Sequence, residues 1–135
     1  MPAASVAPVT APSRGAPAET ADDPARVVGR WRYRTRSNCG RVEGVGEVSF
    51  EWQAASNSYA EAGHVYWADS GVTITWQARD HFDRDRRTLS GRASNSLGDT
   101  VEATWQLAGG PPPDRLAIVW TQTNGCTGEG TATRE

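Results

Sequence analysis

The sequence predicts an all-β protein, an eight-stranded antiparallel up-and-down barrel. From residue 26 onward, apolar residues recur at every second position, which is the period of a strand and not that of a helix. Two pairs of distant residues also fit a closed ring, because the first and last strands of an even-stranded barrel are neighbours. Trp31, near the start of the first segment, then lies beside Arg134 at one rim, and Cys39 lies beside Cys126 at the opposite rim.

Five segments alternate strongly between apolar and polar residues, and they are taken as strands: 30–36, 47–52, 72–79, 101–107 and 116–122. In the first, Trp31, Tyr33 and Thr35 share one face, while arginines occupy the other. Weaker strands are expected over 58–67, 87–95 and 127–134. Clusters rich in Gly, Asn, Asp, Ser or Pro separate these segments and predict short turns. No convincing amphipathic helix is present, and closing such a meander removes its exposed edges.

An immunoglobulin-like β-sandwich is the main alternative, because Cys39, Trp52 and Cys126 imitate its Cys…Trp…Cys order. The tyrosine corner of that fold is missing, since Asn124 stands two residues before the second cysteine. Only nine residues follow Cys126, which is short for a final pairing strand. The barrel is therefore the preferred prediction.

The chain is expected to contain one domain. Residues 1–25 are rich in Ala, Pro, Ser and Thr, so they bury too little apolar surface to become ordered and are interpreted as a disordered tether. Residues 26–135 form the barrel domain. A disulfide between Cys39 and Cys126 is expected, with two unpaired buried thiols as the alternative. A disulfide indicates an oxidising compartment.

Two motifs resemble a known group of proteins. Gly29-x-Trp31 together with Arg134 resembles the calycin barrels, which include lipocalins and avidins. The resemblance implies that the arginine packs across the Trp at the closed end.

Trp76, Ser90-Gly91 and Trp105 are similar in spacing to an avidin segment. Biotin binding does not follow from this likeness. Counting from these anchors places Tyr33, Arg87 and Gly125 where avidins present polar groups to biotin.

The tryptophans divide between the two ends of the predicted barrel. Four of them are expected to plug the closed end beside Arg134, namely Trp31, Trp52, Trp76 and Trp105. Trp67 and Trp120 are expected near the open rim, with Tyr33 and Phe50 pointing inward at mid-height. These four residues are the candidate ligand contacts, with Gln122 and Thr35 as polar partners. A fully packed interior is the alternative.

Motifs for catalysis and cofactors are missing from the sequence. It has no nucleophile elbow, phosphate-binding glycine loop or zinc motif, so no catalytic residue, metal site or cofactor is predicted. Glu61 near His64 is the only acid–base pair worth naming. A net charge of −2 gives no indication of nucleic-acid binding. No segment is long and apolar enough to span a membrane, and the oligomeric state is left open.

These observations favour an exported, non-enzymatic barrel that binds a small, partly apolar ligand at its open rim. The expected location is secreted or periplasmic, with a cytoplasmic one left open. Two alternatives remain. The first is a protein-binding module, such as a secreted protease inhibitor or an immunity-type protein, whose N-terminal segment enters a cleft of its partner. The second is a small barrel cyclase that shapes a reactive chain within an apolar cavity.

Overall fold

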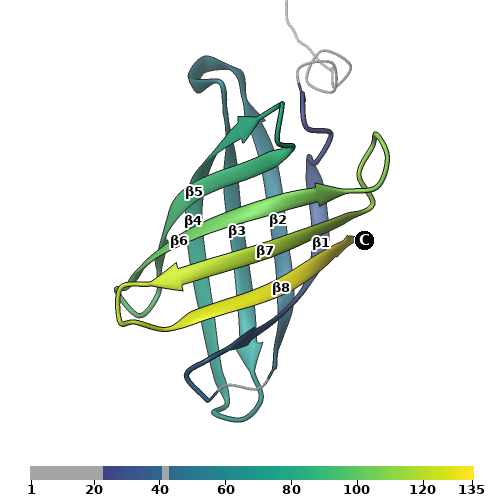
Figure 1. Cartoon of the computed structure of the whole chain (residues 1–135). Coiled ribbons are helices and arrows are strands. Elements are labelled where there is room, and N and C mark those ends of the chain that lie inside the picture. The colour runs from purple at the N-terminus through teal and green to yellow at the C-terminus, as the bar shows by residue number, and fades with distance from the viewer. Residues whose placement is uncertain (1–22, 41–42) are drawn as a thin grey trace, which may run out of the picture.

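The chain forms a closed barrel of eight antiparallel strands, as the sequence predicts (Figure 1). The computed structural model describes residues 23–40 and 43–135. Each strand pairs with the next along the chain, and the last pairs with the first. The strands are β1 (Gly29–Ser37), β2 (Gly44–Gln53), β3 (Ser58–Trp67), β4 (Val72–Asp83), β5 (Thr88–Asn95), β6 (Thr100–Ala108), β7 (Arg115–Gln122) and β8 (Thr127–Arg134).

One sheet that closes on itself excludes the two-sheet sandwich considered as the alternative. The three weaker predicted segments form β3, β5 and β8. In the described part of the chain, the single helical element is the short 3-10 turn η1 (Ala54–Ser56) between β2 and β3. The expected strand pattern is therefore confirmed along the whole barrel.

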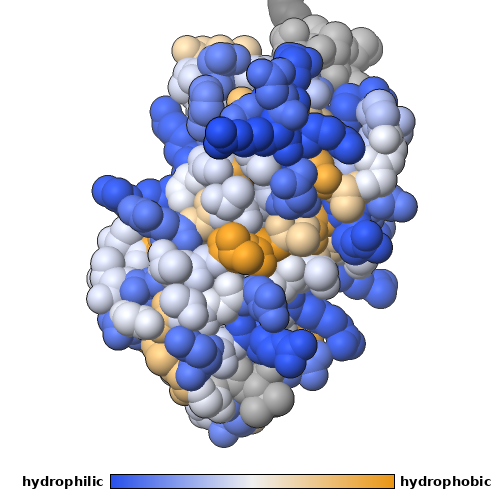
Figure 2. Space-filling view, viewed as in Figure 1, coloured by the Kyte–Doolittle hydropathy of each residue, from blue (hydrophilic) through white to orange (hydrophobic). Residues whose placement is uncertain are grey.

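The alternation of residue types sets which side chains point inward. Along β1, Trp31, Tyr33 and Thr35 are buried, whereas the arginines between them are exposed. The face of the barrel in Figure 2 is accordingly mostly hydrophilic or neutral, with a small apolar patch near its centre. Burial of one face of every strand supplies the main force that holds the ring together.

Closure of the ring brings both predicted end pairs together. Trp31 of β1 is the direct register partner of Arg134 of β8. At the other rim, Cys39 and Cys126 form a disulfide, with their Cα atoms 5.6 Å apart. The bond joins the end of β1 to the start of β8, so it fastens the two strands whose pairing closes the barrel.

Residues 23–28 cover the end of the barrel that holds Trp31. Ala25 and Val27 are buried there, and the indole Nε1 of Trp31 donates to the carbonyl oxygen of Val27 at 2.9 Å. The hydroxyl of Tyr59 donates to the carboxylate of Asp23 and accepts the backbone N–H of Ala25 at 2.8 Å. This end is therefore closed by the chain itself.

The described chain begins two residues before Ala25, the last residue of the predicted tether. Asp23 is 7 % exposed, and its carboxylate accepts the backbone N–H groups of Val27 and Val28 at 3.3 and 3.1 Å. Residues 23–25 thus belong to the closed end. The rest of the predicted tether, residues 1–22, lies outside the described residues.

Candidate functional site

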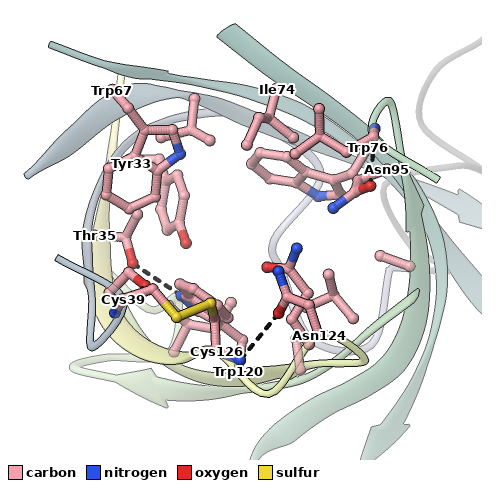
Figure 3. Close-up of a pocket in the computed structure, with 18 of the residues that line it drawn as sticks. Tyr33, Thr35, Cys39, Trp67, Ile74, Trp76, Asn95, Trp120, Asn124 and Cys126 are labelled. Carbon is pink, nitrogen blue, oxygen red and sulfur yellow. Dashed lines mark hydrogen bonds between the residues drawn. A yellow bond between two sulfur atoms is a disulfide. The ribbon is translucent and has the colours of Figure 1, made fainter. Parts of the chain in front are cut away.

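A cavity of about 170 Å³ occupies the disulfide-bearing half of the barrel (Figure 3). Aromatic and aliphatic side chains form most of its walls, and polar groups gather at its mouth and floor. Tyr33, Trp67, Ile74, Trp76 and Trp120 surround the central space in the close-up. The interior on this side is therefore hollow, whereas the opposite half is packed.

Glycines explain why bulky tryptophans leave room in the centre. Gly63 of β3 is the register partner of Trp76 of β4, and Gly128 of β8 is the partner of Trp120 of β7. The ring of each tryptophan occupies the space that a side chain at its partner glycine would fill. Each indole thus lies over the neighbouring strand instead of filling the lumen.

Hydrogen bonds fix one side of the cavity wall. The indole Nε1 of Trp120 donates to Thr35 Oγ1 at 2.9 Å (Figure 3). The Thr35 hydroxyl donates in turn to the carbonyl oxygen of Glu129 at 2.7 Å. Near the mouth, the amide of Gln122 donates to the carboxylate of Asp99 at 2.9 Å. The orientation of Trp120 is therefore set before any ligand arrives.

The carboxylate of Glu61 lies at the floor of the cavity. Glu61 is 4 % exposed and belongs to the lining. Its Oε2 accepts the indole N–H of Trp76 at 2.6 Å, and its Oε1 accepts that of Trp105 at 3.1 Å. Two charge-assisted hydrogen bonds hold this carboxylate inside the barrel.

A second carboxyl group, that of Asp80, lies next to Glu61. Asp80 pairs with Tyr59 in the β3–β4 register, so Glu61 is its diagonal neighbour on the same inner face. Asp80 is 2 % exposed, and Gly91 of β5 leaves room for its carboxyl group. No N–H or hydroxyl group of the described chain donates to its Oδ2.

The environment of Asp80 decides the charge of this pair. Burial raises the pKa of Asp80 to about 10, and its hydrogen bond to Glu61 and the negative charge of that carboxylate act in the same direction. At neutral pH Asp80 therefore holds a proton. Burial raises the pKa of Tyr33 in the lining as well, and Glu61 adds to the effect.

The structure brings together most residues expected at the open rim. Tyr33, Trp67, Trp120, Gln122 and Thr35 all line the cavity. Phe50 is outside the lining that the structure shows, and its ring packs edge-on against Trp105, with 5.8 Å between centroids. The role of these residues in binding stays a prediction.

Three of the expected closed-end residues, Trp31, Trp52 and Arg134, lie there. Arg134 sits over Trp31, and Trp52 packs edge-on against Tyr59 with 4.9 Å between ring centroids. Trp105 is more central, because its indole N–H reaches the cavity floor and its ring packs edge-on against Tyr33.

Trp76 lies elsewhere than expected. The sequence argument placed it low in its strand at the closed end, but it lines the cavity. The reason is strand length, since β4 continues to Asp83 instead of ending at residue 79, so its fifth residue, Trp76, lies nearer the disulfide-bearing end. Its ring packs edge-on against Tyr33, with 5.6 Å between centroids.

The buried carboxyl groups of Glu61 and Asp80 were not predicted from the sequence. The alternation along each strand places both side chains inside the barrel. Glu61 is an even number of positions from the buried Tyr59 and Trp67, and Asp80 is an even number of positions from the buried Ile74. His64 is three positions from Glu61 in the same strand, so its side chain points to the opposite, outer face, where it is exposed. The acid–base pair considered from the sequence is therefore not formed.

No protein-family model and no curated protein matches this sequence. Several solved structures share the fold. A redesigned β-barrel, mFAP1, bound to DFHBI aligns with a TM-score of 0.70 at 16 % identity, covering 80 % of this chain and 94 % of that one. A de novo designed fluorescence-activating β-barrel aligns with a TM-score of 0.67 at 20 % identity, covering 84 % and 98 % of the two chains.

A second redesigned barrel bound to DFHBI, mFAP0, gives a TM-score of 0.64 at 20 % identity, with 80 % and 98 % of the two chains covered. Identities this low establish the barrel architecture alone. Within the described residues, no helix has the length and apolar character needed to cross a membrane.

Proposed function

We propose that this barrel binds a small, partly apolar molecule in the cavity that opens beside the Cys39–Cys126 disulfide. The observation that carries the proposal is the cavity itself, which is hollow, walled by aromatic rings and open at one end. An apolar cavity of about 150 Å³ is large enough to hold benzene. A ligand whose body is one ring therefore fits a cavity of about 170 Å³.

The proposed contacts are Tyr33, Trp67, Trp76 and Trp120 for the apolar body, with Gln122 and Thr35 on the wall. Phe50 acts indirectly, by supporting Trp105 beneath the floor. The barrels mFAP1 and mFAP0 are described as bound to the small molecule DFHBI, which supports a binding role for a lumen of this architecture.

An oxidising compartment, secreted or periplasmic, is the proposed location. A disulfide that fastens the closing strands contributes to stability only where thiols are oxidised. We also propose that this chain is related to the calycins. It is supported by the eight-stranded closure and by the stacking of Arg134 on Trp31.

Native mass spectrometry of protein purified gently from its producer tests the binding role, and the expected result is a small molecule retained at one copy per chain. The denatured mass is expected to lie two hydrogens below that of the reduced chain. The matched variants Ala93→Leu and Ala117→Leu locate the site, because Ala93 lines the cavity and Ala117 is exposed on the outer face.

Ala93→Leu is expected to abolish retention of the molecule, and Ala117→Leu to preserve it. Retention by both variants would place the ligand outside the lumen and overturn the proposal. The proposal would also be overturned if the wild-type barrel retained no small molecule and bound none of benzylamine, benzyl alcohol and benzoate.

A further inference from the structure

The floor of the cavity is negatively charged, and the described lining offers nothing to balance that charge. Glu61 is buried, and the N–H groups that donate to its oxygens belong to the neutral indoles of Trp76 and Trp105. Among residues 23–40 and 43–135, no Arg or His belongs to the lining. A buried carboxylate without a cationic partner carries a large electrostatic cost, so this site favours a ligand that brings a positive charge.

The arginines of the described chain that form ion pairs do so outside the barrel. Arg34 pairs with Glu43 at 2.9 Å, and Arg92 pairs with Glu102 at 2.7 Å, with both arginine side chains more than two-thirds exposed. None of the ion pairs found in the described chain involves Glu61 or Asp80. Within the described chain, therefore, no ion pair balances the carboxylate at the floor.

The walls above the floor suit an organic cation. Aromatic faces attract an ammonium group through their quadrupole, and the attraction grows when the group is removed from water. Tyr33, Trp67, Trp76 and Trp120 surround the lumen (Figure 3), and Glu61 belongs to the same lining. A metal ion fits poorly, because hard cations require several oxygen ligands. No group of three His, Cys, Asp or Glu side chains suited to a metal occurs in residues 23–40 and 43–135.

We infer that the ligand is a small organic cation, an amine with a ring-sized apolar body, whose ammonium group binds the carboxylate of Glu61. The inference rests on the proposed function and names the ligand class for the same cavity. Asp80, the diagonal neighbour of Glu61, is neutral at pH 7 and so adds no second charge beside it.

Three probes of similar size and different charge test the inference: benzylamine, benzyl alcohol and benzoate. Binding is measured at pH 7 by the change in intrinsic tryptophan fluorescence and by isothermal titration calorimetry. Benzylamine is expected to bind at least tenfold more tightly than benzyl alcohol, and benzoate is expected to show no binding.

Two isosteric substitutions identify the group that recognises the charge. Glu61→Gln removes the charge and is expected to reduce the preference for benzylamine over benzyl alcohol at least tenfold. Asp80→Asn keeps a hydrogen-bond donor beside a charged Glu61, so the preference is expected to persist. Ala93→Leu is expected to weaken all binding, whatever the charge of the probe, because it fills the cavity.

The outcomes separate the two claims. If benzyl alcohol or benzoate binds as tightly as benzylamine and Ala93→Leu weakens that binding, the cation inference is wrong and the barrel still binds ligands. If benzylamine binds equally well to the wild type and a folded Glu61→Gln variant, Glu61 is not the anchor. Absence of binding by all three probes overturns the inference. Should Glu61→Gln fail to fold, the three wild-type affinities decide the question.

Discussion

The guanidinium of Arg134 lies over the indole ring of Trp31, with its central carbon 4.2 Å from the ring centroid. The same guanidinium donates to the carbonyl oxygens of Arg26, Pro113 and Val28 at 2.6, 3.3 and 3.4 Å. One side chain thereby joins the last strand, the first strand, the N-terminal segment and the β6–β7 loop. Arg134 therefore links four parts of the chain at the closed end of the barrel.

Arg134→Ala is expected to lower the free energy of unfolding by about 1–3 kcal/mol, since it removes the cation–π contact and leaves carbonyl groups without a protein donor. Chemical denaturation measures the change. Arg30→Ala is the control, because Arg30 is a mostly exposed partner of Glu135 in the same region. Its effect is expected to stay within about 0.5 kcal/mol. Equal effects of the two substitutions would show that the contacts of Arg134 make no specific contribution to stability.

Tyr59→Phe is expected to release the segment that closes the barrel. The substitution removes the hydroxyl that joins Asp23 to the backbone N–H of Ala25, and it leaves that buried N–H without its acceptor. The expected cost is about 1–3 kcal/mol. Hydrogen–deuterium exchange of residues 23–28 is expected to quicken. Tyr66→Phe is the control, since Tyr66 is exposed, and unchanged exchange in both variants would contradict the prediction.

Cys39→Ser together with Cys126→Ser is expected to lower the free energy of unfolding by roughly 4–5 kcal/mol, because the disulfide closes a loop spanning 87 positions. Denaturation of both proteins with and without a reductant checks this. The reductant is expected to lower the stability of the wild type to that of the variant and to leave the variant unchanged. A wild type insensitive to complete reduction would contradict the entropic account.

The stability of the barrel is expected to depend on the ionisation of Asp80. The pKa of Asp80 is about 10 in the folded protein and near its ordinary value of 3.8 in the unfolded chain. Between these values the folded state binds the extra proton, so the contribution of Asp80 to stability falls as the pH rises. The slope for this single proton is at most about 1.4 kcal/mol per pH unit.

Asp80→Asn removes that proton and keeps the shape of the side chain. The difference in unfolding free energy between wild type and variant is therefore expected to shift steadily in favour of the variant from about pH 4 to pH 10. Thermal or chemical unfolding across this range measures the difference. A constant difference would show that Asp80 is ionised inside the barrel at neutral pH.

Local patterns in the sequence were enough to predict the strands. Alternation along β1 assigns Trp31 and Tyr33 to the interior without reference to any partner strand. The pairing of Trp31 with Arg134 was also predictable, because a closed meander with an even number of strands fixes which ends meet. Trp76 was placed too near the closed end because β4 extends to Asp83, beyond the end at residue 79 that the alternation predicted.

The candidate site depended on register, which no local pattern reports. Glu61 lies in β3 and Asp80 lies in β4, so only the pairing of these two strands makes them diagonal neighbours. Their shared environment also requires Trp105 from β6 and Gly91 from β5. A charged residue with inward parity is visible in the sequence, but its partners are not.

The strands, their inward faces, the closure of the ring and the expected cysteine pair could all be read from the sequence, because they follow from a period of two and from chain order. The hollow half of the barrel and the buried carboxyl groups at its floor became visible only in the folded chain. Those properties arise where side chains from several strands meet. Pairing Trp76 with Gly63 and Trp120 with Gly128 leaves the lumen open, and the β3–β4 register makes the buried carboxyl groups of Glu61 and Asp80 diagonal neighbours.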